Sequence, residues 1–208
     1  MDPVVEKSLR EGGLNKITGI DEVGRGSLAG PVVVASVMLP TNHKIDGIND
    51  SKKLSPKKRE EISYLLFERA IDIQVSLAMN GVVDLLNIYN ATKKCIKETL
   101  DNAKVRPDIV VIDGSFNHFK GEYELPFAYQ TLPKGDALSE NVAAASIIAK
   151  ITRDKWMEIN AHKAYPEYGF AQHKGYGTKQ HMEALFKYGP CPLHRMTFSI
   201  KGKKIGDL

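Results

Sequence analysis

Three short runs rich in β-branched and aliphatic residues constrain the fold most, because each has the length of a strand. They are residues 17–20 (ITGI), 31–39 (PVVVASVML) and 109–112 (IVVI). Pro31 has no amide hydrogen to give to a sheet, so it can only begin its run. The continuous apolar run at 109–112, which ends at Asp113, is typical of a strand buried on both faces. A sheet with buried strands is therefore the expected centre of the molecule.

Helices are predicted between these strands. Ser55 followed by Pro56 is typical of a helix start and predicts a helix that ends near Arg69. Helical spacing also predicts helices over residues 83–103 and 137–159, and Thr178 can cap a last helix ending at Tyr188. Residues 71–77 alternate between apolar and polar side chains, which predicts a half-buried strand, and residues 166–177 are predicted to be loop. The order of elements predicts a mixed α/β sheet with helices packed on it.

Composition places the chain among ordinary globular proteins. Hydrophobic residues make up 42% and charged residues 26%, which excludes a disordered or fibrous chain. No apolar run has the length of a membrane span, and the first residues show no apolar signal region, so we expect no membrane and a cytoplasmic location. Two cysteines, Cys95 and Cys191, are too few for a disulfide framework in a chain of 208 residues, so both are expected to be reduced thiols.

Acidic residues stand where the predicted elements meet. Asp21 and Glu22 follow the first strand, Asp113 follows another, and Asp136 lies at the start of the long helix. Each alone has a structural explanation, as a turn residue or a helix cap. Four acids gathered at one sheet end would repel one another unless cations neutralised them. Oxygen ligands without a matching His or Cys set favour Mg²⁺ or Mn²⁺, and two such ions can activate a water and stabilise the leaving oxygen of a phosphodiester.

The turn Gly24-Arg25-Gly26 follows the first two acids. Its glycines let backbone amides approach a ligand closely, and its arginine suits a phosphate. Gly24, Gly26 and Ala29 also fit a dinucleotide-binding fingerprint. That fingerprint must open a helix, whereas this turn leads into the valine-rich strand at 31–39, so we reject it.

Basic residues exceed acidic ones by a small margin. The chain carries 29 Lys and Arg against 25 Asp and Glu, a net charge of +4, and its basic runs lie at 52–59, 93–94, 173–179 and 201–204. Such runs are usually solvated faces, yet they also suit an anionic partner.

Several motifs occur in a fixed order: IDEVGRGSLAGPVV, NDSKKLSPKKRE, VVIDGS, KGD followed by AAASIIAKITRD, YGFAQHKGYGT and HRMTF. Together they resemble the ribonuclease HII family, over nearly the whole chain from about Ile17 to Phe198. The resemblance implies a ribonuclease H-like mixed sheet flanked by helices. It also implies one catalytic domain over residues 1–208, with its core at about 17–155 and a small helical extension at about 156–208.

The resemblance implies roles for individual residues. The metal-binding, catalytic acids of the family fall on Asp21, Glu22, Asp113 and Asp136. Its GRG motif, which grips the ribose 2′-hydroxyl and the adjoining phosphate, falls on Gly24, Arg25 and Gly26, and the tyrosine that reads a ribonucleotide–deoxyribonucleotide junction falls on Tyr176. Phosphate contacts could come from Lys52, Lys150, Arg153, His173, Lys174, Thr178 and Arg195, of which we select Lys52 and Lys174.

The implied activity is metal-dependent cleavage of the RNA strand of RNA–DNA hybrids, and of DNA 5′ to a single embedded ribonucleotide, leaving 5′-phosphate and 3′-hydroxyl ends. Such an enzyme removes ribonucleotides in replication and repair. The sister family, ribonuclease HIII, resembles a longer chain with a lysine in place of the motif arginine, so Arg25 favours type 2. The tail KGKKIGDL shows no sliding-clamp motif, and a monomer is expected.

Three alternatives remain open. Cys191 and His194, with His173 and His181, have spacing that could bind zinc, although a second matched pair is missing. A non-catalytic nucleic-acid binder would explain the basic runs but not the acids at strand ends. A transposase-like or integrase-like nuclease could share the acids but would need no reader of a 2′-hydroxyl.

Overall fold

The computed structural model describes residues 4–115 and 119–208, which form two compact units. The first, called the sheet unit, comprises Met1–Val23, Val34–Ser76 and Lys93–Ile151. The second, called the helical unit, comprises Gly24–Val33, Leu77–Thr92 and Thr152–Leu208. The expected single domain over residues 1–208 stays a prediction.

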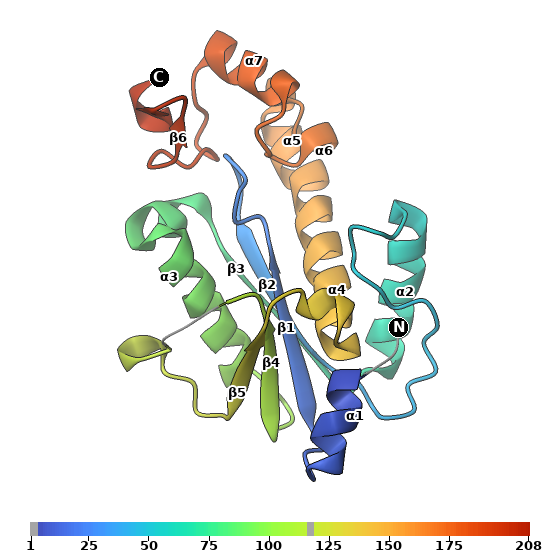
Figure 1. Ribbon diagram of the computed structural model, residues 1–208. Helices are drawn as coiled ribbons and strands as arrows, with labels where there is room; N and C mark the ends of the chain where they lie inside the picture. The colour runs from blue at the N-terminus through green and yellow to red at the C-terminus, as the bar shows by residue number, and fades with distance from the viewer. Residues whose placement is uncertain (1–3, 116–118) are drawn as a thin grey trace. The chain divides into compact units, whose positions relative to one another are not determined.

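A five-stranded mixed sheet is the main feature of the fold, as predicted, and its strand order is β3-β2-β1-β4-β5 (Figure 1). The strands are β1 (Ile17–Val23), β2 (Val32–Met38), β3 (Asp72–Ala78), β4 (Ile109–Asp113) and β5 (Tyr129–Leu132). Strand β4 pairs in parallel with both β1 and β5. All four apolar residues of β4 are buried, because the strand lies between two neighbours.

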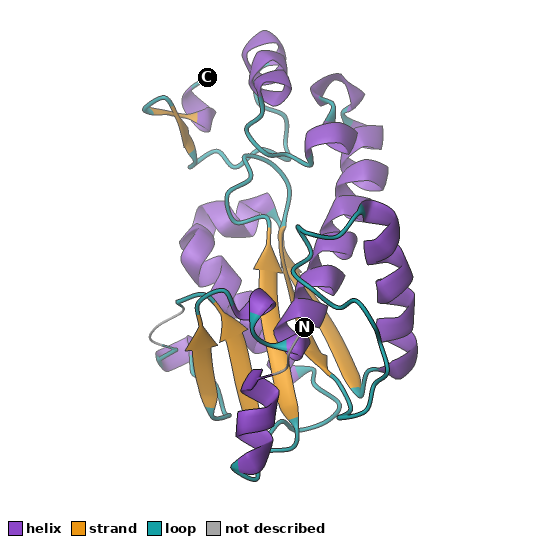
Figure 2. Cartoon of the chain, turned by 45° about the vertical axis from the view of Figure 1, so that its right-hand side comes forward, coloured by secondary structure: helices purple, strands orange, loops and turns teal. Residues whose placement is uncertain are grey.

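Seven α-helices are described in residues 4–115 and 119–208, and Figure 2 shows helices beside the sheet. They are α1 (Val4–Glu11), α2 (Pro56–Arg69), α3 (Asn80–Asp101), α4 (Glu140–Trp156), α5 (His162–Ala164), α6 (Phe170–His173) and α7 (Lys179–Tyr188), with a two-stranded hairpin of β6 (Ser199–Ile200) and β7 (Lys203–Lys204) near the end. Both predicted caps are confirmed. The Ser55 hydroxyl accepts from the Lys58 amide at 3.2 Å, and the Thr178 hydroxyl accepts from the His181 amide at 3.3 Å.

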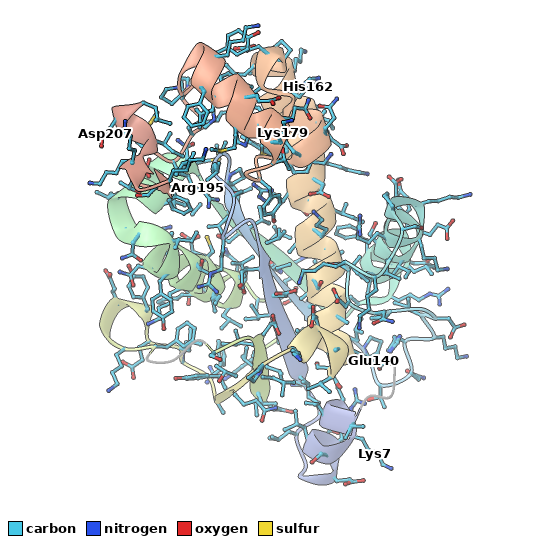
Figure 3. The ribbon with its side chains drawn as sticks, turned by 45° about the horizontal axis from the view of Figure 1, so that its top comes forward. Lys7, Glu140, His162, Lys179, Arg195 and Asp207 are labelled. Atoms are coloured by element: carbon cyan, nitrogen blue, oxygen red, sulfur yellow. The ribbon has the colours of Figure 1, made fainter. Side chains whose placement is uncertain are left out.

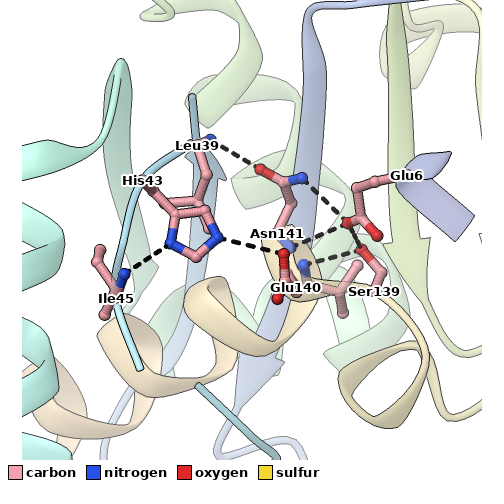
Figure 4. A network of polar contacts seen from close by, with 8 residues as sticks. Glu6, Leu39, His43, Ile45, Ser139, Glu140 and Asn141 are labelled. Atoms are coloured by element: carbon pink, nitrogen blue, oxygen red, sulfur yellow. Dashed lines mark hydrogen bonds and ion pairs between the residues drawn. The ribbon is translucent and has the colours of Figure 1, made fainter. Parts of the chain in front are cut away.

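Helix α4 begins directly against β1. Gly19 of β1 lies so close to the backbone of Asn141 and Val142 that a Cβ there would clash with it. The alanines that follow are fully buried, which confirms that small residues let this helix approach the sheet. Glu6 of α1 binds the same helix start, where its Oε1 accepts from the Ser139 hydroxyl at 2.5 Å (Figure 4).

Several boundaries differ from the prediction. The long helix starts at Glu140 rather than 137, because residues 135–137 form a separate 3₁₀ turn, and it continues past Trp156 as a π-helical turn, Met157–Ala161. Helix α3 is broken at Asn87, which has φ 63° and ψ 163°. The Asn87 side chain accepts from the amides of Tyr89 and Asn90, so this residue caps the second half of the helix. The predicted loop at 166–177 contains the short helix α6.

Strand β3 forms as predicted, but its polar side chains are the buried ones. Asp72 and Ser76 are at most 9% exposed, whereas Val75 is 38% exposed. The reason is hydrogen bonding to residues distant in the sequence: Asp72 accepts from the Lys104 amide at 2.7 Å, and the Ser76 hydroxyl donates to Glu98 at 2.5 Å. Strand β5 and helix α1 were not predicted, and residues 116–118 of the segment between Asp113 and Asp136 lie outside the described residues.

Cys95 and Cys191 are free and buried, as expected. Within residues 4–115 and 119–208, every helix is too short or too polar to cross a membrane. The expected cytoplasmic location stays a prediction.

Candidate active site

Parallel pairing of β1 and β4 brings two of the predicted acids together. Ile20 lies opposite Ile112 in the register, so Asp21 and Asp113 are the next residues on adjacent strands. The Gly135 amide donates to Asp113 Oδ1 at 2.6 Å, which holds the 3₁₀ turn containing Asp136 beside β4. Asp21, Glu22, Asp113 and Asp136 therefore all belong to one end of the sheet unit.

Asp21 shows that these acids interact electrostatically. Its side chain is buried, and burial together with the carboxylates of Glu22, Asp113 and Asp136 raises the pKa of Asp21 well above its usual value. The Glu22 amide donates to Asp21 Oδ1 at 2.7 Å, which opposes that shift. The site therefore holds more negative charge than its surroundings compensate.

A fifth carboxylate, which the sequence analysis did not select, belongs to the same cluster. Burial and the neighbouring Asp50 and Asp113 raise the pKa of Asp136, and Lys52 opposes this shift. Lys52 Nζ lies 3.8 Å from Asp136 Oδ2, with 78% of the lysine side chain exposed. Asp50 belongs to the NDSKK motif, two residues before Lys52, so this motif could have indicated the fifth acid.

The donor chemistry of this cluster fits a divalent metal ion. Every candidate ligand is a carboxylate oxygen, which suits Mg²⁺ or Mn²⁺, and a cation would favour the charged forms that burial and mutual repulsion disfavour. In the arrangement described for residues 4–115 and 119–208, no three His, Cys, Asp or Glu side chains converge closely enough to hold an ion. The ligand roles of the four acids stay predictions.

The predicted reader of the ribose lies in the helical unit, in residues 24–31, here called the glycine loop. Gly24 has φ 91°, and a Cβ there would clash with the Arg153 side chain and the Pro31 carbonyl. Gly26 differs, because its backbone conformation is ordinary and a Cβ would meet open space. The fold therefore requires glycine at 24 but not at 26.

The second predicted reader, Tyr176, lies in residues 173–178, here called the tyrosine loop. This loop contacts the glycine loop directly, because the Leu28 amide donates to the Gly175 carbonyl at 2.8 Å. A Cβ on Gly175 would clash with the Ala29 carbonyl, so glycine is needed there for close approach. The Tyr176 ring lies 5.3 Å from the Arg153 guanidinium carbon. The structure thus brings Gly24, Arg25, Gly26 and Tyr176 together in one unit.

Two arginines considered for phosphate contacts are buried instead. Arg153 and Arg195 are both 0% exposed, and all their hydrogen bonds go to the protein. Neither can reach a phosphate at the surface, so that candidacy was wrong for both. Arg195, labelled in Figure 3, comes from the segment between α7 and β6.

The two selected lysines differ in what holds them. Lys174 Nζ lies 2.7 Å from Glu158 Oε1 and also donates to the Ala171 carbonyl, with 15% of its side chain exposed. The charge of Lys174 is therefore already compensated, whereas most of the Lys52 side chain is exposed. This contrast favours Lys52 as the phosphate contact.

The histidines of the zinc alternative bind one another. The Cys191 amide donates to His194 Nδ1 at 2.9 Å, so the other ring nitrogen of His194 carries the proton and donates to His181 Nε2 at 3.0 Å. His181 Nδ1 then donates to the Tyr176 carbonyl at 3.0 Å. These bonds occupy both ring nitrogens of His181 and His194, so neither side chain has a free nitrogen for a zinc ion, which argues against the zinc alternative.

A mixed sheet with carboxylates near the ends of adjacent parallel strands is typical of a class, the nucleases with a ribonuclease H-like fold. The family model described as ribonuclease HII matches residues 18–201. Ribonuclease HII of Enterococcus faecalis is 47% identical over 194 residues, which are 93% of this chain and 73% of that protein. The chain belongs to the ribonuclease HII family.

Solved structures agree with this assignment. Ribonuclease H2 from Pyrococcus horikoshii has a TM-score of 0.73 and 27% identity, and the match covers 88% of this chain and 94% of that one. The PCNA:RNase HII complex from Archaeoglobus fulgidus has a TM-score of 0.75 and 27% identity, covering 93% and 100%. The chain is a ribonuclease H, a hydrolase of a family that acts on RNA–DNA hybrids and depends on divalent metal ions. The non-catalytic alternative is thereby excluded.

One of these neighbours was solved with PCNA. The tail KGKKIGDL shows no sliding-clamp motif, and the presence of PCNA in that complex means that the lack of a motif is no argument against a clamp partner. Oligomeric state stays a prediction.

Proposed function

We propose that this enzyme cuts the RNA strand of RNA–DNA hybrids and nicks duplex DNA on the 5′ side of a single embedded ribonucleotide. The products are a 5′-phosphate and a 3′-hydroxyl end. The enzyme acts as a monomer, and its role is the removal of ribonucleotides from DNA during replication and repair.

The observation that carries this proposal is the gathering of the acids at one end of the sheet unit, where the parallel register of β1 and β4 places Asp21 next to Asp113 and the Gly135 amide binds Asp113. The raised pKa of Asp21, caused by burial and by the neighbouring acids, agrees with it. A cluster of carboxylates with uncompensated charge is suited to divalent cations and has no evident structural purpose. Asp21, Glu22, Asp113 and Asp136 would hold Mg²⁺ or Mn²⁺, and the bound ions would supply an activated water and stabilise the leaving oxygen. Lys52, with its exposed amine beside Asp136, would bind a phosphate of the substrate.

Discrimination between RNA and DNA rests on the glycine loop. The only sugar difference is the 2′-hydroxyl, so a reader needs hydrogen-bonding groups that can approach it closely. Gly26 supports this role because nothing in the protein requires a glycine there, whereas a side chain would occupy the open space that a ribose needs. Tyr176, held against the same loop, would contact the next sugar and detect a junction.

The test uses a labelled DNA duplex with one ribonucleotide, incubated with Mg²⁺, Mn²⁺ or chelator, beside an all-DNA duplex and a continuous RNA–DNA hybrid. We expect a metal-dependent nick 5′ to the ribonucleotide, no cut in the all-DNA duplex, and no cut by Asp21→Asn. Cleavage of the hybrid alone would contradict the junction-reading claim while keeping the nuclease chemistry. Equal cleavage of all-DNA duplex would remove the claim that the glycine loop reads a 2′-hydroxyl.

A further inference from the structure

Two fully buried guanidinium groups lie under the glycine loop, and each interacts with an acid only at longer range, Arg153 with Asp154 and Arg195 with Asp84. Arg153 donates from Nε to the Pro31 carbonyl at 2.8 Å and from Nη2 to the Ala29 carbonyl at 3.1 Å. Arg195 donates to the Gly30 carbonyl at 3.0 Å and, from Nη1, to the Arg25 carbonyl at 2.9 Å. In the described residues, no hydrogen bond or ion pair joins either group to an acid.

Arg153 also connects the two loops. Its Nη1 donates to the Lys174 carbonyl of the tyrosine loop at 2.9 Å, and its Nη2 donates to the Ser27 hydroxyl at 2.8 Å. The same hydroxyl donates to the Gly24 carbonyl at 2.9 Å, so a chain of hydrogen bonds runs from Arg153 to the first glycine of the GRG motif. One planar group thus fixes both loops and lies against the Tyr176 ring.

This arrangement is costly for the fold. A buried charge is destabilising unless it is paired, and two like charges add their repulsion. Burial and the charge of Arg153 lower the pKa of Arg195 to about 9, which reflects that cost. Apolar side chains could fill this space at a lower cost in free energy. They could not, however, bind the carbonyl groups of residues 25, 29, 30, 31 and 174.

We infer that Arg153 and Arg195 are positioning residues, which hold the glycine loop and Tyr176 in the one arrangement that recognises a single ribonucleotide. The inference rests on the proposed function of those two loops. A single ribonucleotide offers only one 2′-hydroxyl, so both loops must be in place together. A continuous hybrid offers a 2′-hydroxyl at every position and tolerates displaced loops better.

The experiment compares Arg153→Lys and Arg195→Lys with wild type and with Arg106→Lys, an exposed arginine of the sheet unit that serves as control. Lysine keeps the charge but lacks the planar fork that reaches several acceptors at once. For each protein, kcat/KM is measured on the one-ribonucleotide duplex and on the continuous hybrid, and the ratio of the two is taken. Partial unfolding lowers both values equally, so a purely structural role would leave the ratio unchanged.

We expect the ratio to fall at least about 5-fold in Arg153→Lys and in Arg195→Lys, and to stay at the wild-type value in Arg106→Lys. An unchanged ratio in both buried variants would overturn the inference. If either buried variant fails to fold, Ser27→Ala decides, because it removes only the hydroxyl between Arg153 and Gly24. A ratio lowered about 2-fold or more in Ser27→Ala supports the inference, and a wild-type ratio overturns it.

A double-mutant cycle with Tyr176→Ala separates positioning from direct contact. If Arg153 acts through Tyr176, Arg153→Lys should lower the ratio less in the Tyr176→Ala background than in wild type. Full additivity would overturn action through Tyr176. Failure of the proposed function is seen separately, because the wild-type protein would then not nick the one-ribonucleotide duplex at all.

Discussion

The carboxyl group of Asp21 lowers the stability of the fold, and we propose that the protein retains it for activity. Its carboxyl group is buried, and the neighbouring acids raise its pKa. A raised pKa means that the folded state disfavours the charged form, so the ionised group destabilises the fold at neutral pH. Residues that bind substrate or metal commonly impose such a cost.

Replacement of Asp21 by Asn should therefore separate the two properties. We expect Asp21→Asn to lose at least about 1,000-fold in kcat while its Tm without metal rises, because the substitution removes one negative charge from the cluster. Activity assays and thermal unfolding in chelator measure the two effects. A lower Tm, or appreciable turnover with metal present, would contradict this assignment of Asp21.

Substitution of Gly24 and of Gly26 is expected to have different effects, on stability at Gly24 and on activity at Gly26. Gly24→Ala should destabilise the protein by roughly 2 kcal/mol or more, because alanine disfavours a positive φ and its Cβ would clash with Arg153. Gly26→Ala should leave the Tm within about 2 °C of wild type and still lower activity on the one-ribonucleotide duplex. Thermal melts and the nicking assay test both variants, and an active Gly26→Ala protein would exclude close approach of a sugar at this residue.

Sequence patterns predicted that Asp21 and Asp113 would lie close together, but they did not predict the burial of Arg153 and Arg195. Each acid comes directly after a short apolar run, with Asp21 inside β1 and Asp113 as the last residue of β4, and parallel pairing brings these positions together, so local patterns sufficed. Arg153 and Arg195 look like surface cations in the sequence. Their burial depends on carbonyl groups far along the chain, such as Pro31 and Lys174 for Arg153, which no local pattern reveals.

At the scale of elements, α1 completes the amino-terminal end of α4. Glu6 Oε1 accepts from the Ser139 hydroxyl and, at 3.1 Å and 3.0 Å, from the backbone and side-chain nitrogens of Asn141 (Figure 4). The Asn141 side chain in turn accepts from the Leu39 amide at 2.8 Å, at the end of β2. A carboxylate at a helix amino terminus also interacts favourably with the helix dipole.

Removal of this carboxylate should weaken the junction of the two helices. We expect Glu6→Ala to cost roughly 2–4 kcal/mol of unfolding free energy, because it leaves buried donors without an acceptor. Glu6→Gln should cost less, since an amide oxygen can replace Oε1. Glu11→Ala, at an exposed position on the same helix, is the control for urea unfolding. Equal effects of Glu6→Ala and Glu11→Ala would contradict the capping role.

The histidine pair that supports the tyrosine loop makes stability depend on pH. Burial lowers the pKa of both His181 and His194 to about 4, and their hydrogen bonds require neutral rings. In the unfolded chain the two histidines have a pKa near 6.5. Between pH 6.5 and 4 they therefore bind more protons in the unfolded chain than in the folded protein. This contribution to stability is complete above pH 6.5 and is lost as the pH falls toward 4.

The expected loss is on the order of 3 kcal/mol for one histidine across that window. Urea unfolding of wild type and His194→Gln at pH 5 and pH 7.5 measures it. The wild-type protein should lose more stability on acidification than the variant. Parallel behaviour of the two proteins would show that the pair is not the source of the pH dependence.

At the scale of the whole molecule, the chain has a small excess of positive charge, and the charged side chains are unevenly distributed. The net charge is +4, yet the sheet unit concentrates carboxylates at one site and presents Lys52 beside them. Sequence-independent binding to nucleic acid depends on such cations and on the counterions they release from phosphates.

Lys52→Ala should therefore weaken binding to all duplexes alike and reduce the slope of log K against log salt by about 1. Binding is measured with the Asp21→Asn background so that no substrate is cut. Lys7→Ala, an exposed lysine of α1, is the control. A change in preference between substrates, with the slope unaltered, would show that Lys52 does not contact a phosphate.

The overall architecture was predictable because strand and helix periods are local properties of the sequence. Strands β1, β2 and β4 and helices α2 and α7 begin and end close to their predicted residues. The burial of β3 was not predictable, because Asp72 and Ser76 point inward to meet Lys104 and Glu98, which belong to another part of the chain. Tertiary hydrogen bonds there outweigh the apolar pattern.

The way in which the chain passes between its two units has a consequence for evolution and for engineering. One passage, at 23/24, falls at the end of β1, whereas those at 33/34, 76/77, 92/93 and 151/152 fall inside β2, β3, α3 and α4. Cutting the gene at any of the latter points would break a strand or a helix rather than a linker. We therefore expect that neither unit folds when it is expressed alone, and that the acids of the sheet unit and the glycine loop of the helical unit need one continuous chain.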